Sequence, residues 1–445
     1  MQLRPLFEQV PKLPLATFFG RVSKLIGLLV ESDGPVGAIG EEMLIHGEDG
    51  RNIPAEVVGF NGKKVLLMPI DNTDGIKSGM YVEGTGELPL LPVSEKLLGR
   101  VIDPLGNPLD GGPPIPAESR VPINNAPPNP MLRQRIKEPL ATGVRAIDGM
   151  LTLGKGQRVG IFAGSGVGKS TLLGMIARNT SADVNVIVLV GERGRELKEF
   201  IDNDLGVEGL RRSVVVVATS DQTPLLRLRC ALAGTAVAEY YMQKGKDVLM
   251  MMDSVTRFAM AQREVGLSAG EPPSSRGYTP SVFALLPRLM ERAGNFEGKG
   301  SITAIYAVLV EGDDMNEPIS DAVRGILDGH IILSRKLAAK NHYPAIDVLG
   351  SISRLFSTLA VPEHKQLVAK IRDLMSTYSD AEDLIQIGAY AKGSSPQIDQ
   401  AIQFNPEIQA FLKQAVSEES NFNQTLMDMG KVFGVDFSKY LTEAV

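Results

Sequence analysis

The hydrophobic pattern of this 445-residue chain changes character twice between its two ends. From about residue 17 to residue 92, short apolar stretches are separated by turn pairs such as Asn61-Gly62 and Asp74-Gly75. Evenly spaced short strands of this kind predict a small antiparallel β-barrel. Proline and glycine are then frequent between residues 103 and 130, which indicates a connector.

From about residue 135 to residue 360, wholly apolar runs alternate with helix-compatible stretches. The runs cover residues 158–162, 184–190, 214–218, 248–252 and 302–310. Apolar strands separated by helices predict a mostly parallel sheet that is covered on both faces. Helix-compatible segments dominate from residue 362 onward. We therefore expect an N-terminal segment (1–16), a barrel (17–92), an α/β domain (93–360) and a C-terminal helical domain (361–445).

A glycine-rich turn links the first apolar run to a helix-compatible run at 171–178. The turn reads Ala-Gly-Ser-Gly-Val-Gly-Lys-Ser at residues 163–170, so alanine replaces the first glycine of the usual pattern. A chance glycine turn is the alternative, but a strand, such a turn and a helix together form a phosphate cradle. The residues expected to bind nucleotide are Gly164, Ser165, Gly166, Val167, Gly168, Lys169, Ser170 and Thr171. Lys169 is expected to reach the β- and γ-phosphates and Ser170 to hold Mg²⁺, so the chain is expected to bind a nucleoside triphosphate.

Two carboxylates follow apolar runs, where open α/β sheets place their chemistry. Glu192 stands after the second run and is suited to orient or deprotonate an attacking water, or else to pair with Arg193 or Arg195. Asp253 follows the fourth run, in the Walker B arrangement that acts on Mg²⁺ through water. Arg257 follows Asp253 by one helical turn and either supports the phosphate end or pairs with a carboxylate.

The segment 343–354 combines an aromatic residue, a proline turn and a terminal arginine. An arginine brought to a γ-phosphate stabilises the charge that spreads in the transition state. Arg354 could supply that charge, although spacing alone favours a surface ion pair.

Charge and cysteine content exclude several classes of protein. The net charge is −6, from 46 basic and 52 acidic residues, which argues against nucleic-acid binding. The single cysteine, Cys230, excludes an internal disulfide and is expected to be a buried thiol. No secretory signal is visible, and the longest apolar run, 184–190, is too short to span a bilayer. We expect a soluble, cytoplasmic protein.

Several motifs together resemble the hexameric rotary-type ATPase family, which includes ATP synthase catalytic subunits and the type III export ATPases. The resemblance covers essentially the whole chain and is closest to the flagellar protein-export branch. It rests on the cradle and on residues 56–62, 191–195, 260–264, 311–314, 344–347, 351–353 and 388–393. It implies a RecA-like nucleotide-binding core for the α/β domain.

The resemblance also implies roles for individual residues. Lys169 and Ser170 would bind phosphate and Mg²⁺, Glu192 would activate water, and Asp253 would be the Walker B carboxylate. Arg193 and Arg257 would line the phosphate end, and Tyr343 and Tyr390 would sandwich the adenine ring. Arg354 resembles an arginine finger offered to the neighbouring subunit, which replaces the surface-pair interpretation.

The assembly and partners follow from the same resemblance. Because one chain carries both Glu192 and Arg354, we expect a homohexamer with six equivalent sites. The implied activity is ATP hydrolysis that releases export substrates from chaperones and supports their delivery to the membrane gate. The implied partners are a regulatory stator protein, a central stalk protein, the gate proteins and chaperone–substrate complexes, at the inner-membrane export apparatus. Family members often bind the regulator through a longer amphipathic helix in the segment that here carries Leu3, Leu6, Phe7 and Val10 and is broken by prolines.

Four other functions remain as alternatives. A virulence-type (injectisome) export ATPase has the same chemistry with different cargo. An ATP synthase subunit is disfavoured by the short C-terminal helical region and the Ala163 loop. A hexameric RNA translocase is disfavoured by the negative charge, and a non-hydrolysing ring member by intact Lys169, Glu192 and Asp253.

Overall fold

The computed structural model describes residues 17–48 and 50–440, so the expected N-terminal segment and its regulator contact lie outside the described residues. Six strands near the N-terminus form a closed barrel in the order β1-β2-β5-β4-β3-β6. They are β1 (Phe19–Ile26), β2 (Leu29–Asp33), β3 (Glu42–His46), β4 (Asn52–Asn61), β5 (Lys64–Pro69) and β6 (Tyr81–Gly84). Alternate residues such as Val22, Met43 and Leu67 fill the barrel, which confirms the predicted architecture.

The expected connector contains short strands of its own. β7 (Leu90–Val93) pairs with β9 (Ser119–Pro122), and β10 (Pro139–Leu140) pairs with β11 (Leu153–Gly154). β8 (Val101–Ile102) joins the edge of the central sheet beside β14. Two 3₁₀ turns, η2 (Glu95–Leu97) and η3 (Pro130–Leu132), complete this region. The connector is therefore attached to the central domain along much of its length.

The central sheet has the strand order β19-β18-β12-β17-β15-β13-β14-β8. Its main strands are β12 (Arg158–Ala163), β13 (Val184–Glu192), β14 (Ser213–Thr219), β15 (Val248–Asp253), β17 (Ser301–Leu309), β18 (Gly329–Leu333) and β19 (Ile346–Ser353). Neighbouring strands along this order are parallel, except that β19 runs antiparallel to β18, and the short β16 (Gly294–Asn295) pairs antiparallel with β17. The five predicted strands are confirmed, whereas β18 and β19 were not predicted because their burial alternates with exposure.

Both faces of this sheet are buried, as the apolar runs require. On β13, Val186 and Val188 face one hydrophobic cluster, while Ile187 and Leu189 face the other. The helices that pack in this domain are α2 (Arg145–Met150), α3 (Lys169–Asn179), α4 (Gly194–Glu199), α5 (Gly206–Arg211), α6 (Pro224–Gln243), α7 (Val255–Ser268), α8 (Pro280–Met290), α9 (Pro318–Ile326), α10 (Arg335–Ala339) and α11 (Phe356–Leu359). η4 (Phe200–Leu205) is a π-helix, and η5 (Ser275–Gly277) and η6 (Glu311–Asp313) are short 3₁₀ turns. Cys230 is fully buried on α6, as expected.

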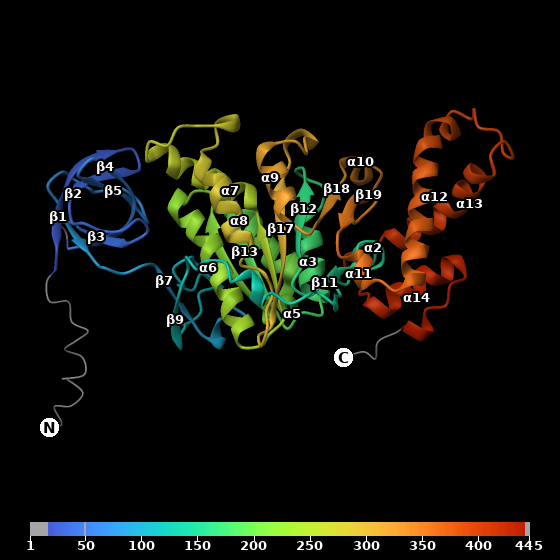
Figure 1. The fold of residues 1–445 in the computed structure, drawn as a ribbon, viewed down its shortest axis with the longest axis horizontal. Helices are drawn as coiled ribbons and strands as arrows, with labels where there is room; N and C mark the ends of the chain where they lie inside the picture. The colour runs from blue at the N-terminus through green and yellow to red at the C-terminus, as the bar shows by residue number, and fades with distance from the viewer. Residues whose placement is uncertain (1–16, 49, 441–445) are drawn as a thin grey trace, which may run out of the picture.

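Three C-terminal helices, α12 (Pro362–Gln386), α13 (Pro396–Leu412) and α14 (Phe422–Phe433), are followed by η7 (Ser438–Tyr440). Figure 1 shows the barrel and these helices at opposite ends of the molecule, with the central sheet between them. The barrel is tied to α6 by Arg229, which is 3% exposed and pairs with Glu42 at 2.7 Å and Glu56 at 2.8 Å. In the part of the chain that the structure describes, no helix is long and apolar enough to cross a membrane.

Candidate active site

The glycine-rich turn lies between β12 and α3, where the sequence predicts it. Gly166 has a φ of 78° and Gly168 a φ of 87°, and both values favour glycine strongly over other residues. Gly168 is the N-cap of α3, and its carbonyl accepts the Leu172 N–H at 3.0 Å. Because the first N–H groups of a helix lack intrahelical partners, this turn presents backbone donors to an anion.

The residues of the turn differ in their surroundings. Ser165, Gly166 and Ser170 are exposed, while Gly164 and Val167 are buried beneath them. The Thr171 hydroxyl hydrogen-bonds the Asp204 carboxylate. Of the two hydroxyl side chains at the start of α3, Ser170 is therefore the one that is exposed to solvent.

Lys169 and Asp253 form an ion pair between the turn and the end of β15. The Lys169 Nζ donates a hydrogen bond to Asp253 Oδ1, and the two side chains are 12% and 6% exposed. β15 lies between β13 and β17, two strands away from β12. The sheet thus brings the predicted phosphate-binding lysine and the predicted Walker B carboxylate into contact.

Glu192 ends β13, the strand next to β15. The register shifts between Val190 and Glu192, and Gly191 has a φ of 70°, so the strand turns where the carboxylate emerges. Burial, as the larger cause, and the negative charge of Asp253 together raise the pKa of Glu192 to about 7. The positive charges of Lys169 and Arg257 oppose that rise. Glu192 therefore lies close enough to Asp253, Lys169 and Arg257 to interact electrostatically with each of them.

Two arginines near Glu192 have different environments. The Arg257 Nε is buried and has no hydrogen-bond partner among the described residues. A buried donor without a partner is costly, and a bound phosphate oxygen would satisfy it. Arg193 is 74% exposed and pairs with Glu196 at 3.0 Å, and Arg195 pairs with Glu199 at 2.9 Å. Arg193 and Arg195 therefore pair with Glu196 and Glu199 and not with Glu192, so the alternative that Glu192 serves as their ion-pair partner is not supported.

The two tyrosines expected to enclose adenine lie in different parts of the fold. Tyr343 is beside the cradle, because a Cβ atom built on Gly168 would lie 3.4 Å from Cε1 of the tyrosine ring. Tyr390 lies in the loop between α12 and α13, where its hydroxyl is 3.0 Å from the Asp399 carboxylate and the Ser395 carbonyl. Figure 1 places that loop at the end of the C-terminal helices, away from β12 and α3. The structure therefore brings only Tyr343 to the cradle.

Two residues next to the cradle were missed by the sequence analysis. The Gln414 N–H donates to the Tyr343 carbonyl at 3.0 Å, so the chain after α13 borders this tyrosine. A Cβ on Gly164 would lie 2.5 Å from Nη2 of Arg335, and Arg335 Nε is 3.4 Å from Asp313 Oδ1. Arg335 follows β18 directly, so recognition of that strand would have placed it beside the turn.

Arg354 lies near the amino-terminal ends of the parallel strands, whereas the cradle lies at their carboxyl-terminal ends. Ser353, at the end of β19, pairs with Gly329 at the start of β18, whereas Ala163 pairs with Leu333 at the end of β18. The two positions are roughly 13 Å apart along the strand, at about 3.3 Å per residue. The Arg354 side chain is exposed and has no hydrogen bond or ion pair among the described residues. It cannot serve the cradle of its own chain.

Comparison with known proteins shows the family of this chain. The nucleotide-binding domain of the ATP synthase alpha/beta family matches residues 143–353, and the β-barrel domain of that family matches residues 22–86. The T3SS EscN ATPase C-terminal domain matches residues 360–431. The flagellum-specific ATP synthase of Bacillus subtilis is 56% identical over 94% of this chain and 95% of that protein. The chain belongs to this family of export ATPases.

Further relatives come from the type III secretion branch of the family. The type 3 secretion system ATPase of Xanthomonas euvesicatoria is 50% identical over 95% of this chain and 97% of its own length. Two solved structures of EscN from enteropathogenic E. coli, the assembled ATPase and its complex with the central stalk EscO, are 44% identical and have TM-scores of 0.88 and 0.86. Each covers 93% of this chain and 99% of the solved chain. The protein is thus an ATPase with the barrel, RecA-like core and C-terminal helices that the sequence predicts.

Proposed function

We propose that this ATPase is the motor of the flagellar type III export apparatus, where hydrolysis releases export substrates from chaperones and supports their delivery to the membrane gate. The flagellum-specific relative from B. subtilis shares more of its sequence with this chain than the secretion ATPase of X. euvesicatoria does. A virulence-type export ATPase is the second candidate, because relatives of that branch match almost as well.

One observation carries the catalytic part of the proposal: Glu192 with its raised pKa lies beside the Lys169–Asp253 pair. A carboxylate with a pKa near neutrality is suited to accept a proton from water. On nucleotide binding, Lys169 exchanges Asp253 for the β- and γ-phosphates. Glu192 then orients the attacking water and accepts its proton, and the buried Nε of Arg257 donates to a phosphate oxygen.

The same chemistry requires Mg²⁺ with ATP. Mg²⁺ keeps several waters and the substrate phosphates as ligands, so it needs few protein oxygens. The exposed Ser170 hydroxyl and the Asp253 carboxylate provide such oxygens, and the described residues contain no cluster of three or more histidine, cysteine or acidic groups that would hold a metal alone. Ser170 would hold Mg²⁺ directly and Asp253 would hold it through water, and the ion would supply charge neutralisation at the phosphates.

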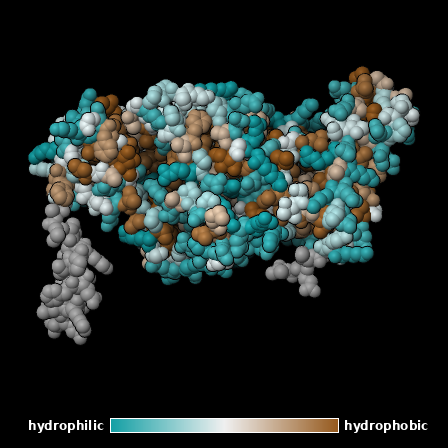
Figure 2. Space-filling view, in the orientation of Figure 1, coloured by the Kyte–Doolittle hydropathy of each residue, from teal (hydrophilic) through white to brown (hydrophobic). Residues whose placement is uncertain are grey.

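The position of Arg354 supports a ring in which each site is completed by the next chain. Its guanidinium is exposed at the edge opposite the cradle, so a head-to-tail neighbour can receive it. Figure 2 shows hydrophobic atoms gathered on the barrel end of the visible face, and the barrel's exposed apolar residues include Phe19, Phe60 and Tyr81. Large exposed apolar surface of this kind favours contact between copies. We propose a homohexamer with six equivalent sites, consistent with the assembled state of EscN.

The partners of the motor are a central stalk protein, a regulatory stator protein, the gate proteins and chaperone–substrate complexes. The EscN complex with EscO supports the stalk partner. We place the ring in the cytoplasm, held peripherally at the inner-membrane export apparatus.

The proposal is tested by replacing Glu192 with glutamine in the chromosomal copy. We expect the purified Glu192→Gln protein to bind ATP while its hydrolysis falls at least about 100-fold, as for loss of a general base. Export of flagellar hook and filament proteins should fall with it, while any injectisome effectors are still secreted. Glu196→Gln, an exposed carboxylate four residues away, is the matched control and should hydrolyse normally. Parental hydrolysis by Glu192→Gln would remove its assigned role, and loss of effector secretion alone would favour the virulence branch.

A further inference from the structure

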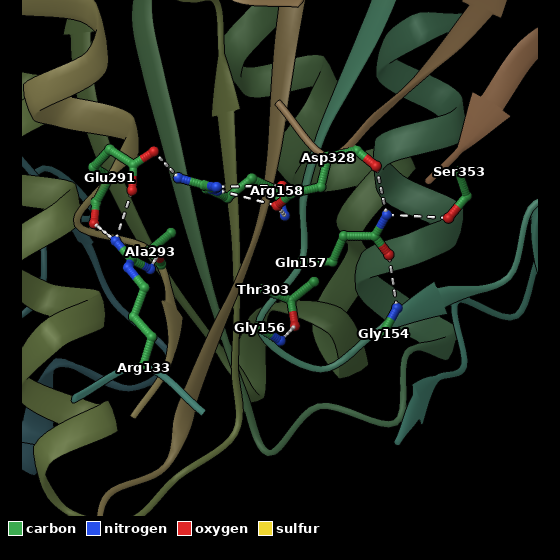
Figure 3. Close-up of polar contacts among 10 residues, drawn as sticks. All are labelled: Arg133, Gly154, Gly156, Gln157, Arg158, Glu291, Ala293, Thr303, Asp328 and Ser353. Carbon is green, nitrogen blue, oxygen red and sulfur yellow. Dashed lines mark hydrogen bonds and ion pairs between the residues drawn. The ribbon is translucent and has the colours of Figure 1, made fainter. Parts of the chain in front are cut away.

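A buried polar cluster lies at the amino edge of the central sheet, where β12 begins. Figure 3 shows Gln157 at its centre, with its side-chain amide directed between Asp328 and Ser353. The Gln157 Nε2 donates to the Asp328 carbonyl and to Ser353 Oγ, both at 3.1 Å, and Gln157 Oε1 accepts the Gly154 N–H at 2.9 Å. The side chain has no exposed surface, and both of its amide hydrogens are used.

These bonds fix the backbone on both sides of the Arg354 N–H. The Asp328 carbonyl that accepts from Gln157 also accepts the Arg354 N–H at 3.0 Å. Ser353, the residue before Arg354, bonds Gln157 through its hydroxyl, which also donates to the Thr152 carbonyl at 3.1 Å. Because the Arg354 side chain has no partner of its own among the described residues, its direction depends on this backbone.

An ion-pair chain holds Asp328 from the other side. Arg158 donates to the Asp328 carboxylate from its backbone N–H and Nη2 at 3.2 Å and from Nε at 3.1 Å. Arg158 also pairs with Glu291 just after α8, and Glu291 receives Arg133 at 2.8 Å, as Figure 3 shows. Asp328, whose carbonyl is shared by Gln157 and Arg354, is therefore also held through its carboxylate by Arg158, which Glu291 holds in turn.

We propose that Gln157 is a positioning residue for Arg354, which holds that arginine in the direction required by the neighbouring chain's γ-phosphate. This inference rests on the proposed completion of each site by a neighbour. Loss of the amide would leave the buried Gly154 N–H without its partner, so Gln157 also contributes to stability. In addition, satisfied polar networks specify one arrangement of the groups that they join.

The test is Gln157→Met, which keeps the volume and removes the three hydrogen bonds. We expect kcat to fall about 10- to 100-fold, since a displacement of about 1 Å at a reacting centre can cost that much, while the affinity for ATP is unchanged. Asn185→Leu is the matched control, because Asn185 on β13 is another fully buried amide. Its side chain hydrogen-bonds the Ala177 carbonyl on α3 and the Ser213 hydroxyl on β14. It should keep the parental kcat. Parental kcat for Gln157→Met would overturn the proposal.

A mixing experiment separates positioning from a general structural role. Lys169→Ala has a disabled cradle and a correctly held Arg354, whereas Gln157→Met has an intact cradle and a misplaced Arg354. Rings mixed from the two should hydrolyse ATP faster than either alone, because a Gln157→Met cradle can then face a correctly held arginine. If the mixture shows no gain, or if Gln157→Met also binds ATP more weakly, Gln157 acts on its own cradle and the proposal is wrong.

Two further variants complete the design. If Gln157→Met does not fold, Ser353→Ala removes one acceptor of the same amide and should lower kcat about 3- to 10-fold, with the same recovery on mixing; unchanged kcat would count against the proposal. Arg354→Ala distinguishes the two levels of the argument. If Arg354→Ala hydrolyses ATP at the parental rate, the proposal that Arg354 completes the neighbouring site is wrong. If Arg354→Ala loses hydrolysis while Gln157→Met keeps the parental rate, only the positioning role of Gln157 is wrong. The double variant should be no slower than Arg354→Ala.

Discussion

Lys169 and Asp253 form an ion pair inside the cradle. The lysine proposed to bind phosphate is therefore held by the carboxylate proposed to act at the Mg²⁺ site. In the proposed function, phosphate would replace Asp253 as the partner of Lys169, and Mg²⁺ would then balance the charge of Asp253, so neither of these largely buried side chains would lack an opposite charge.

This pairing predicts an energetic coupling between the two residues. Lys169→Met leaves the Asp253 carboxylate buried without its partner and should destabilise the chain by roughly 3–5 kcal/mol. Adding Asp253→Asn should restore most of that loss, because the uncompensated charge is then gone. Denaturant unfolding of the parent, both single variants and the double variant without nucleotide gives the coupling energy. Simple additivity would show that the pair is not coupled.

The raised pKa of Glu192 predicts a pH dependence of hydrolysis. Glu192 must be unprotonated to accept the proton of the attacking water, and its pKa is about 7 in the free protein. We expect kcat/KM for MgATP to fall toward tenfold per pH unit as the pH drops below about 7. Steady-state rates between pH 5.5 and pH 9, at fixed ionic strength, would measure this. A flat profile down to pH 5.5 would be incompatible with Glu192 as the base.

The same shift predicts a pH-dependent gain of stability in Glu192→Gln. A carboxyl group whose folded pKa is raised above 4.5 contributes stability below its unfolded pKa and loses that contribution as pH rises through about 7. Without nucleotide, Glu192→Gln should therefore match the parent near pH 4.5 and exceed it by about 1–2 kcal/mol at pH 8, after allowance for partial exposure. A variant less stable than the parent at pH 8 would contradict the assigned cause of the shift.

The two tyrosines should differ in their effect on nucleotide binding. Tyr343→Ala removes the ring beside Gly168 and should raise the Kd for ATP about tenfold or more, because base stacking on an aromatic ring contributes about 1–3 kcal/mol. Tyr343→Phe should bind normally. Tyr390→Ala should leave the Kd unchanged, since its hydroxyl bonds within the α12–α13 loop. Fluorescent-nucleotide titration would decide, and the reverse order of effects would restore the sandwich expected from the sequence.

The sequence predicted the parts of the site that depend on local pattern. The glycines at 166 and 168, and the carboxylates at the ends of β13 and β15, follow from buried strands and the turns after them. Tyr390 was assigned to the adenine site from the family resemblance, since the sequence itself does not show which loops meet around Tyr343. The cluster around Gln157 was not predicted, because its bonds join residues 171 and 196 positions apart. These partners meet only because β18 and β19 pair in the sheet. Neither strand was predicted, because buried and exposed residues alternate along both.

The central claim is that the cradle of one chain and Arg354 of the next form a single catalytic site. Mixing Lys169→Ala with Arg354→Ala, each inactive alone, tests it most directly through the rate of ATP hydrolysis. The account predicts that activity appears in the mixture and passes through a maximum at an intermediate ratio, where intact cradles face intact arginines. No hydrolysis at any ratio, in rings shown to contain both variants, would contradict it.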